Sequence, residues 1–149
     1  MLASKKISAF WTNCLLLVTV GVMVFGASLF LSPSLARAGF STLLFANPTQ
    51  LNQFDPAALR YIDLLHGVLG AVMFGWGAAL TLLVKRAFAR GERWAWRIVT
   101  FSVLAWFIPD TFISVSSGFW QNAVLNVFFL LLFAVPLLAT YRAFHADDK

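Results

Sequence analysis

Charged residues are scarce in this chain of 149 residues: Lys and Arg together number 11, and Asp and Glu together number 6. They make up 11% of the sequence, whereas ordinary soluble domains carry about 25% charged residues. Hydrophobic residues reach 60%, and the mean hydropathy is +0.82. This composition excludes an ordinary soluble domain. It predicts a single integral membrane domain that covers residues 1–149.

Cysteine and histidine are almost absent as well. Cys14 is the only cysteine, which excludes an internal disulfide and a CxxC redox centre. His66 lies within an apolar stretch, whereas His145 lies beyond the last one. One intramembrane histidine, with the cysteine near the opposite end of the bundle, supplies neither a zinc site nor two axial haem ligands. We therefore predict no metal ion and no cofactor.

The net charge of +5 comes from basic residues that cluster beside the apolar stretches. In that position they are typical of a topology signal or of contacts with anionic lipid headgroups. The sequence contains no nucleic-acid-binding motif. The predicted partner of the basic residues is therefore the lipid bilayer, and nucleic acid is excluded.

Four apolar stretches are long enough to cross a bilayer, whose hydrocarbon core of about 30 Å needs about 20 helical residues. The predicted fold is all-α, a bundle of four transmembrane helices at about residues 9–32, 57–84, 94–116 and 122–143. Pro33 is expected to end the first helix, and Lys85 and Arg86 close the second. A polar turn at residues 117–122 is expected between the third and the fourth.

The first apolar stretch has a second interpretation as a cleaved signal peptide. Lys5 and Lys6 would supply its positive start, and the sequence Ala36-Arg37-Ala38 fits a cleavage site. However, the stretch is about twice as long as the usual apolar core of about 7–15 residues. The length favours a membrane-spanning helix.

The distribution of Lys and Arg predicts the orientation. Two of them, Arg37 and Arg60, lie in the long loop after the first helix. The N-terminus, the loop after the second helix and the C-terminus hold the others: Lys5, Lys6, Lys85, Arg86, Arg90, Arg93, Arg97, Arg142 and Lys149. Basic residues accumulate on the cytoplasmic side, so both termini are predicted to be cytoplasmic.

The first external loop, residues 33–60, is long for so small a bundle. Its apolar centre, residues 39–45, is too short to span the membrane and is expected to lie along the interface or fold over the bundle. Asp55 is expected to cap a helix that begins at Pro56.

Small residues recur at intervals of four in the second helix, at Gly67, Ala71 and Gly75. Such a stripe lets a neighbouring helix approach closely. We predict an intramolecular packing seam here. The alternatives are a face for a second copy of the chain or room for a ligand.

Asp110 is the only charged side chain between Arg97 and Arg142, inside the third predicted helix. A charged residue at the centre of a membrane helix costs about 2.5–3.5 kcal/mol on insertion scales, so it usually faces the protein interior and has a partner. Pro109 removes a main-chain donor beside it. Asp110 is therefore the leading candidate site residue.

The predicted topology places several other polar residues with it in the outward-facing half of the membrane. The candidates for ligand binding or proton exchange are Asp110, His66, Asn126, Ser114, Asp63 and Asn122. An Asp–His pair at one depth would be able to exchange a proton or bind the polar head of an apolar ligand.

Each candidate also has a structural interpretation. Asp63 would be a solvated or helix-starting carboxylate, His66 a satisfied histidine, and Asn122 a cap of the fourth helix. Asn126 and Ser114 would join helices by hydrogen bonds. Asp110 would fix helix register through a bond to His66 or Asn126.

Three segments, Leu65–Gly77, Trp106–Thr111 and Asn122–Asn126, resemble small bacterial four-helix membrane proteins of unknown function. In length and layout the chain also resembles the DoxX-like group. The resemblance implies a location in the bacterial inner membrane and a compact four-helix bundle. It carries over no catalytic motif.

The sequence is compatible with three functions. The sequence favours a non-enzymatic inner-membrane protein that binds a protein partner, a second copy of itself or a lipophilic small molecule in its outward-facing half. The alternative is a small proton-coupled transporter that uses Asp110, although the chain lacks the internal repeat of many transporters. A membrane-embedded enzyme comes third, because Ser114 has no convincing base and orienting group, and no catalytic residue is predicted.

Overall fold

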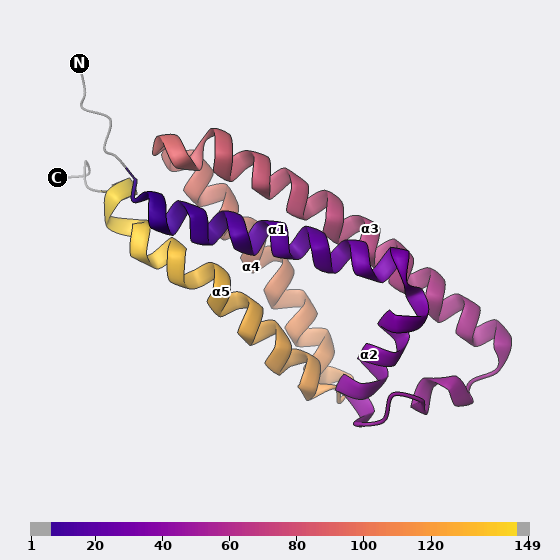
Figure 1. Ribbon diagram of the computed structural model, residues 1–149. Coiled ribbons are helices and arrows are strands. Elements are labelled where there is room, and N and C mark those ends of the chain that lie inside the picture. The colour runs from indigo at the N-terminus through magenta and orange to yellow at the C-terminus, as the bar shows by residue number, and fades with distance from the viewer. Residues whose placement is uncertain (1–6, 146–149) are drawn as a thin grey trace, which may run out of the picture. The chain divides into compact units, whose positions relative to one another are not determined.

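The computed structural model describes residues 7–145, and these residues form helices and turns without any strand (Figure 1). The prediction of an all-α protein with four helices long and apolar enough to cross a membrane is confirmed. Lys5, Lys6 and Lys149 lie outside the described residues. The helices are α1 (Ala9–Leu31), α2 (Pro33–Phe45), α3 (Pro56–Arg86), α4 (Arg93–Ser116) and α5 (Trp120–His145), with short 3₁₀ helices η1 (Gln50–Gln53) and η2 (Phe88–Arg90).

The segment predicted as the first external loop contains a helix of its own. α1 ends at Leu31, as expected from Pro33, but Pro33 also starts α2, because a proline fits the first turn of a helix. α2 ends where Ala46 adopts a left-handed conformation with φ of 54°. The predicted cap of α3 is confirmed: Oδ1 of Asp55 accepts hydrogen bonds from the main-chain nitrogens of Ala57 and Ala58, at 2.8 and 3.1 Å.

The turn between α4 and α5 is shorter than predicted. It occupies residues 117–119, because α5 already begins at Trp120. Gly118 has a φ of 82°, a conformation that favours glycine. The main-chain nitrogen of Phe119 donates to the carbonyl oxygen of Ser114 at 2.8 Å, and that of Gly118 donates to Val115 at 3.0 Å. These two bonds form a Schellman motif, which ends α4 and returns the chain at once into α5.

The chain forms two compact units. One is residues 21–78, and the other contains residues 7–20 and 79–145 of the described chain. α1 and α3 each run through both units without a break.

Within residues 21–78, α1 and α3 approach most closely at Gly26 and Gly70. A Cβ atom at Gly26 would lie 2.6 Å from the main-chain nitrogen of Phe74, and one at Gly70 would lie 2.5 Å from the carbonyl oxygen of Gly26. The predicted seam at Gly67, Ala71 and Gly75 is therefore corrected, because a Cβ atom at Gly67 or Gly75 would meet nothing within 4 Å. The stripe of small residues at Gly67, Ala71 and Gly75 is thus not the packed face of α3 in this unit; the face with Gly70 packs against α1.

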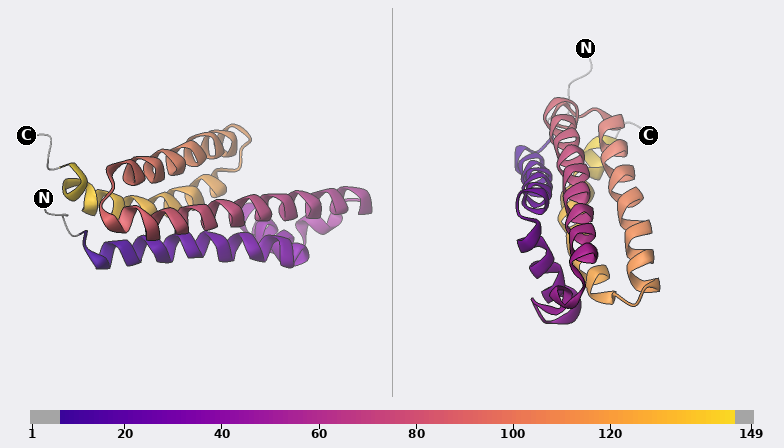
Figure 2. Two further views of the ribbon diagram at one scale, coloured as in Figure 1. Left: turned by 90° about the horizontal axis from the view of Figure 1, so that it is seen from above. Right: turned by 90° about the vertical axis from the view of Figure 1, so that its right-hand side faces the viewer.

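In the other unit, α4 and α5 lie side by side in antiparallel directions (Figure 2). The indole nitrogen of Trp96 in α4 donates to the carbonyl oxygen of Leu137 in α5 at 3.0 Å. Thr81 of α3 donates to the buried hydroxyl of Thr19 in α1 at 2.9 Å. Most buried residues of α5 are separated by three, four or seven positions, the spacing of one helix face: Ala123, Asn126, Phe133, Leu137, Thr140 and Phe144, with Pro136 beside Leu137.

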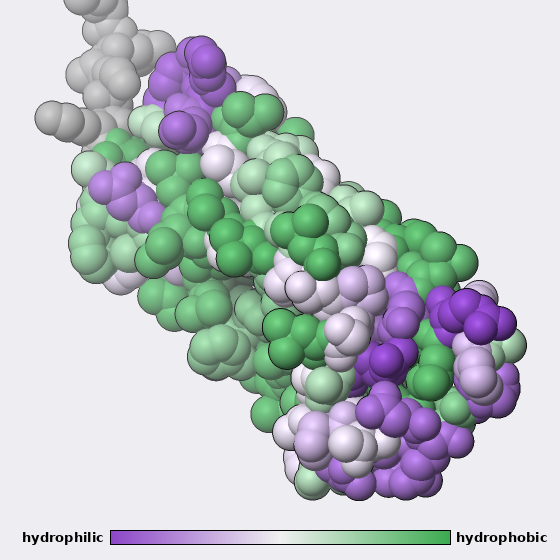
Figure 3. All heavy atoms as spheres, turned by 45° about the vertical axis from the view of Figure 1, so that its right-hand side comes forward, coloured by the Kyte–Doolittle hydropathy of each residue, from purple (hydrophilic) through white to green (hydrophobic). Residues whose placement is uncertain are grey.

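The four long helices carry large apolar side chains on their exposed faces, among them Leu17, Val72, Phe101 and Leu138. Apolar residues cover most of the visible surface of these helices in Figure 3. Exposed apolar patches of this extent are rare on soluble monomers. Together with helix length they indicate a membrane protein.

Candidate functional site

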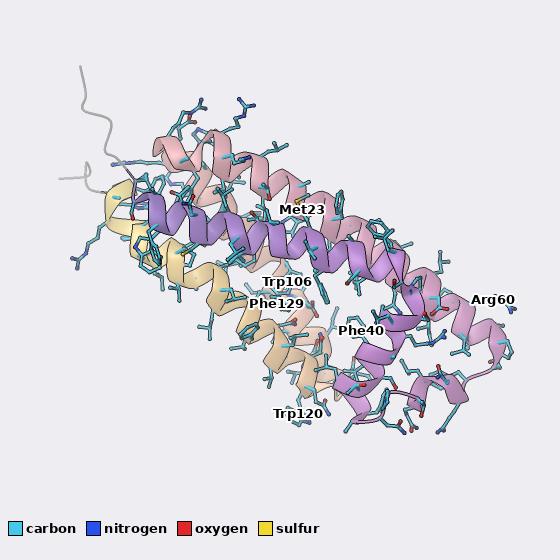
Figure 4. The ribbon with its side chains drawn as sticks, in the orientation of Figure 1. Met23, Phe40, Arg60, Trp106, Trp120 and Phe129 are labelled. Carbon is cyan, nitrogen blue, oxygen red and sulfur yellow. The ribbon has the colours of Figure 1, made fainter. Side chains whose placement is uncertain are left out.

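Asp110 lies inside α4, which continues as a helix through Pro109. The indole nitrogen of Trp106 donates to Oδ2 of its carboxylate at 3.0 Å, and the amide nitrogen of Asn122 donates to Oδ1 at 3.2 Å. The hydroxyl oxygen of Ser114 is 3.3 Å from the same Oδ1 atom. We call Trp106, Asp110, Ser114 and Asn122 the Asp110 cluster; Trp106 is labelled in Figure 4.

Local geometry explains how these four residues meet. Trp106 and Ser114 are four residues before and after Asp110, so all three share one face of α4. The tight turn at Gly118 places the first turn of α5 beside that face, which brings in Asn122. Asn122 therefore belongs to α5 and links it to α4; the interpretation of Asn122 as a helix cap is corrected.

Ser114 fastens the cluster and is itself buried. A serine hydroxyl has a single hydrogen to donate. The hydroxyl oxygen is 2.7 Å from the main-chain carbonyl oxygen of Asp110 but 3.3 Å from the carboxylate, so the hydroxyl donates to the main-chain carbonyl. The hydroxyl oxygen in turn accepts a hydrogen bond from the amide of Asn122 at 2.8 Å. Both amide hydrogens of Asn122 are thus used within the cluster.

The electrostatics of the cluster are unusual for a carboxylate within a membrane span. Across residues 7–145, every recorded hydrogen bond to the Asp110 carboxylate comes from an uncharged group. The carboxylate is partly exposed, and its two oxygens offer about four lone-pair sites. The cluster therefore holds the side chain in place without a cation to balance its charge.

Asn126 lies one turn further along α5 and is buried. Its amide nitrogen donates a long hydrogen bond of 3.4 Å to the hydroxyl of Thr111 in α4. The expectation that Asn126 joins helices agrees with this contact. The predicted bond from Asn126 to Asp110 is corrected, since the amide partner of Asp110 is Asn122.

A second polar group lies within residues 21–78, where α2 meets α3. Nη1 of Arg37 is 2.8 and 2.9 Å from the two carboxylate oxygens of Asp63, so Asp63 is ion-paired and not simply solvated. One turn later, the ring of His66 stacks on Phe40, with centroids 5.0 Å apart and an interplanar angle of 24°. We call Arg37, Phe40, Asp63 and His66 the α2–α3 clasp.

The structure thus brings Asp110, Ser114 and Asn122 together, whereas Asp63 and His66 each contact α2. The predicted Asp110–His66 pair stays a prediction. Sequence reasoning missed Trp106, Arg37 and Phe40 as members of these groups. The signal for Trp106 was its spacing of four residues from Asp110. Arg37 and Phe40 are three residues apart, which also places them on one face of a helix, but α2 itself was not predicted.

Among residues 7–145, no three His, Cys, Asp or Glu side chains gather as metal ligands would. No protein-family model, curated protein or solved structure matches this chain.

Proposed function

We propose that this chain is a multi-pass protein of the bacterial inner membrane that binds a lipophilic small molecule and catalyses no reaction. Both termini are cytoplasmic in this proposal, which rests on the accumulation of Lys and Arg beside the ends of α3, α4 and α5. The Asp110 cluster then lies in the outward-facing half of the membrane, near the turn between α4 and α5.

The observation that carries the proposal is the uncompensated charge of Asp110. Its hydrogen-bond donors are the indole of Trp106 and the amide of Asn122, the nearby Ser114 hydroxyl is also uncharged, and none of these groups is cationic. Charged groups within a membrane span are costly and are usually paired, and unpaired ones mark sites of function. A ligand with a cationic head would supply the missing charge, while its apolar body remained in the hydrocarbon.

Trp106 adds a second recognition element. Its indole nitrogen is bonded to the carboxylate, so the aromatic ring lies directly beside the negative charge. The faces of tryptophan rings attract cations, most strongly where water is excluded. An aromatic ring and a carboxylate side by side form a suitable receptor for an organic cation.

The geometry of Ser114 supports binding without catalysis. Its hydroxyl donates to a main-chain carbonyl and accepts from Asn122. A catalytic serine needs a neighbouring base that takes its proton. In the Asp110 cluster, the hydroxyl instead serves as a link between α4 and α5.

The test uses tetraphenylphosphonium, a lipophilic cation, with tetraphenylborate as an anion of matched size and shape. Binding of each probe is measured on the protein in lipid nanodiscs, and the signal of empty nanodiscs is subtracted. We expect saturable binding of the cation and none of the anion. Asp110→Asn should weaken cation binding at least about tenfold, equivalent to about 1.4 kcal/mol.

The matched control is Asp55→Asn. It removes one negative charge from the start of α3 and leaves a residue that also caps helices. Binding in this variant should equal that of the wild type. Equal binding of the two probes, or full cation binding by Asp110→Asn, would overturn the proposal. Capture of a transmembrane protein at this site instead of the probe would also overturn it.

A further inference from the structure

The hydroxyl of Ser114 can accept one more hydrogen bond than it accepts from the described residues. Its hydrogen goes to the main-chain carbonyl oxygen of Asp110, at 2.7 Å, and its oxygen accepts from the amide of Asn122, at 2.8 Å. A hydroxyl oxygen has two lone pairs, so a second donor fits. Oδ1 of Asp110 lies 3.3 Å from the same hydroxyl oxygen. An ionised carboxylate has no hydrogen to donate to it, whereas a protonated carboxyl group has one.

The hydrogen bonds of the Asp110 cluster suit a neutral carboxyl group as well as a carboxylate. Trp106 donates to Oδ2, which would be the carbonyl oxygen of the neutral group and would keep that bond. A hydrogen on Oδ1 would be donated to Ser114. Asn122 would keep Ser114 and Oδ1 as its acceptors, since hydroxyl oxygens also accept. Each polar side-chain hydrogen of the cluster therefore has an acceptor in either state of Asp110.

Charge balance favours a proton on Asp110 when no cation is bound. The donors recorded to its carboxylate are uncharged. A charge within a membrane span is costly unless a partner compensates it. Burial away from water likewise favours the neutral form of a carboxyl group. One cation or one proton is enough to neutralise a single carboxylate, so the two would compete for Asp110.

Asp110 is the only titratable group at this end of the α4–α5 pair. α4 carries no other charged or titratable side chain between Arg97 and its end at Ser116, and α5 carries none before Tyr141. Arg97 is about 20 Å from Asp110 along α4, at about 1.5 Å per residue. A pH-dependent change at this end of the pair is therefore assigned to Asp110.

Polar side chains lead from the cluster to the turn between α4 and α5. Asp110 lies about 9 Å below the end of α4, at about 1.5 Å per residue, and its side chain is partly exposed. Ser114 is one turn nearer to that end, and the exposed residues Ser116 and Ser117 follow it. A proton that leaves Asp110 thus has a short polar path to water at the turn.

We propose that Asp110 exchanges one proton for one organic cation, and that Ser114 accepts the carboxyl hydrogen in the proton-bound state. This inference rests on the proposed function, because it concerns the same carboxylate. When the cation binds, the bond between Oδ1 and its hydrogen breaks, the proton passes to water, and the carboxylate pairs with the cation. Cation binding therefore weakens as the pH falls, because a smaller fraction of the protein is ionised at Asp110.

The experiment measures binding of tetraphenylphosphonium to the full chain in phosphatidylcholine nanodiscs, with the signal of empty nanodiscs subtracted. This probe has no titratable group of its own. Its affinity should be at least about fivefold lower at about pH 5 than at about pH 8, because only the ionised form binds it. In lightly buffered solution at about pH 5, addition of the probe should also release protons, which a dissolved pH indicator detects.

The controls separate this exchange from cation binding itself. Any binding that remains in Asp110→Asn should not depend on pH, whereas Asp55→Asn should keep the wild-type ratio of the two affinities. Equal affinity at both pH values, without proton release, would overturn the exchange and leave the cation site standing. Absence of binding at both pH values would overturn the exchange and the proposed function together.

Two serine variants test the acceptor of the carboxyl hydrogen. Ser114→Ala and Ser116→Ala each remove one hydroxyl from α4, and that of Ser116 donates to the carbonyl oxygen of Ile113 at 3.1 Å. Without Ser114 the neutral carboxyl group loses its acceptor, so the ratio of the two affinities should shrink at least about twofold. Ser116→Ala should keep the wild-type ratio. The same ratio in both variants would overturn the role assigned to Ser114.

Discussion

The amide of Asn122, in the first turn of α5, donates to the carboxylate of Asp110 in α4 at 3.2 Å. The two residues are separated by twelve positions and by the turn at Gly118, so this bond fastens the α4–α5 hairpin where it closes. The same bond uses an uncharged donor. It thus links the two helices without bringing a cation to the Asp110 carboxylate.

The first prediction concerns this fastening. Asn122→Ala removes both amide hydrogen bonds and should lower the free energy of unfolding by about 0.6–1.7 kcal/mol, the range measured for polar contacts between membrane helices. Unfolding in mixed micelles with increasing dodecyl sulfate measures the change. Val124→Ala, at an exposed position of α5, is the control and should have little effect. An unchanged free energy in Asn122→Ala would refute the fastening role.

The second prediction concerns the two glycine faces of α3. Gly70→Ala places a methyl group against the carbonyl oxygen of Gly26, and backbone atoms must move apart. We expect a loss of about 1–3 kcal/mol in the free energy of unfolding, as for overpacked cores. Gly75→Ala meets open space in the same helix and should be tolerated. Unfolding in mixed micelles measures the change in both variants. Comparable losses in Gly70→Ala and Gly75→Ala would show that the packed face of α3 is not the one with Gly70.

The third prediction concerns the α2–α3 clasp. A double-mutant cycle of Arg37→Gln and Asp63→Asn should give a coupling energy of about 1 kcal/mol or less. The limit is low because 17% and 32% of the two side chains remain exposed, so solvent screens their attraction. Thermal unfolding of the four proteins in detergent gives the coupling. A cycle with Arg60→Gln in place of Arg37→Gln should show none.

The fourth prediction separates the two parts of the proposed cation receptor. Trp106→Phe keeps an aromatic ring beside Asp110 but removes the indole donor. Because a phenyl face attracts cations less strongly than an indole face, binding of tetraphenylphosphonium should weaken, though less than in Asp110→Asn. Titration in nanodiscs measures both affinities. A larger loss in Trp106→Phe than in Asp110→Asn would assign recognition to the ring.

The number of long helices was predictable from the sequence, because a stretch of about 20 apolar residues crosses a bilayer as a helix, in which every backbone hydrogen bond is made within the segment. The Asp55 cap was predictable for a similar reason: Asp before Pro at the start of an apolar run is a local signal. α2 was missed because 13 residues of mixed polarity, from Pro33 to Phe45, resemble an interfacial loop.

The pairing of residues across helices was only partly predictable. Asp110 stood out because it is charged in an apolar segment, but its partner depended on the exact end of α4. The Schellman turn begins α5 two residues earlier than expected, which moves Asn122 from a cap into contact with Asp110. Likewise, Gly67 and Gly70 are both small residues of α3, and only the position of α1 decides which of them packs.

Infrared difference spectroscopy on the protein in nanodiscs, before and after addition of tetraphenylphosphonium, tests the role of Asp110 most directly. We predict that the probe shifts a carboxylate stretching band and that this change is absent in Asp110→Asn but present in Asp55→Asn. A spectrum without any carboxylate change, or the same change in Asp110→Asn, would contradict the account of Asp110 as the ligand-binding charge.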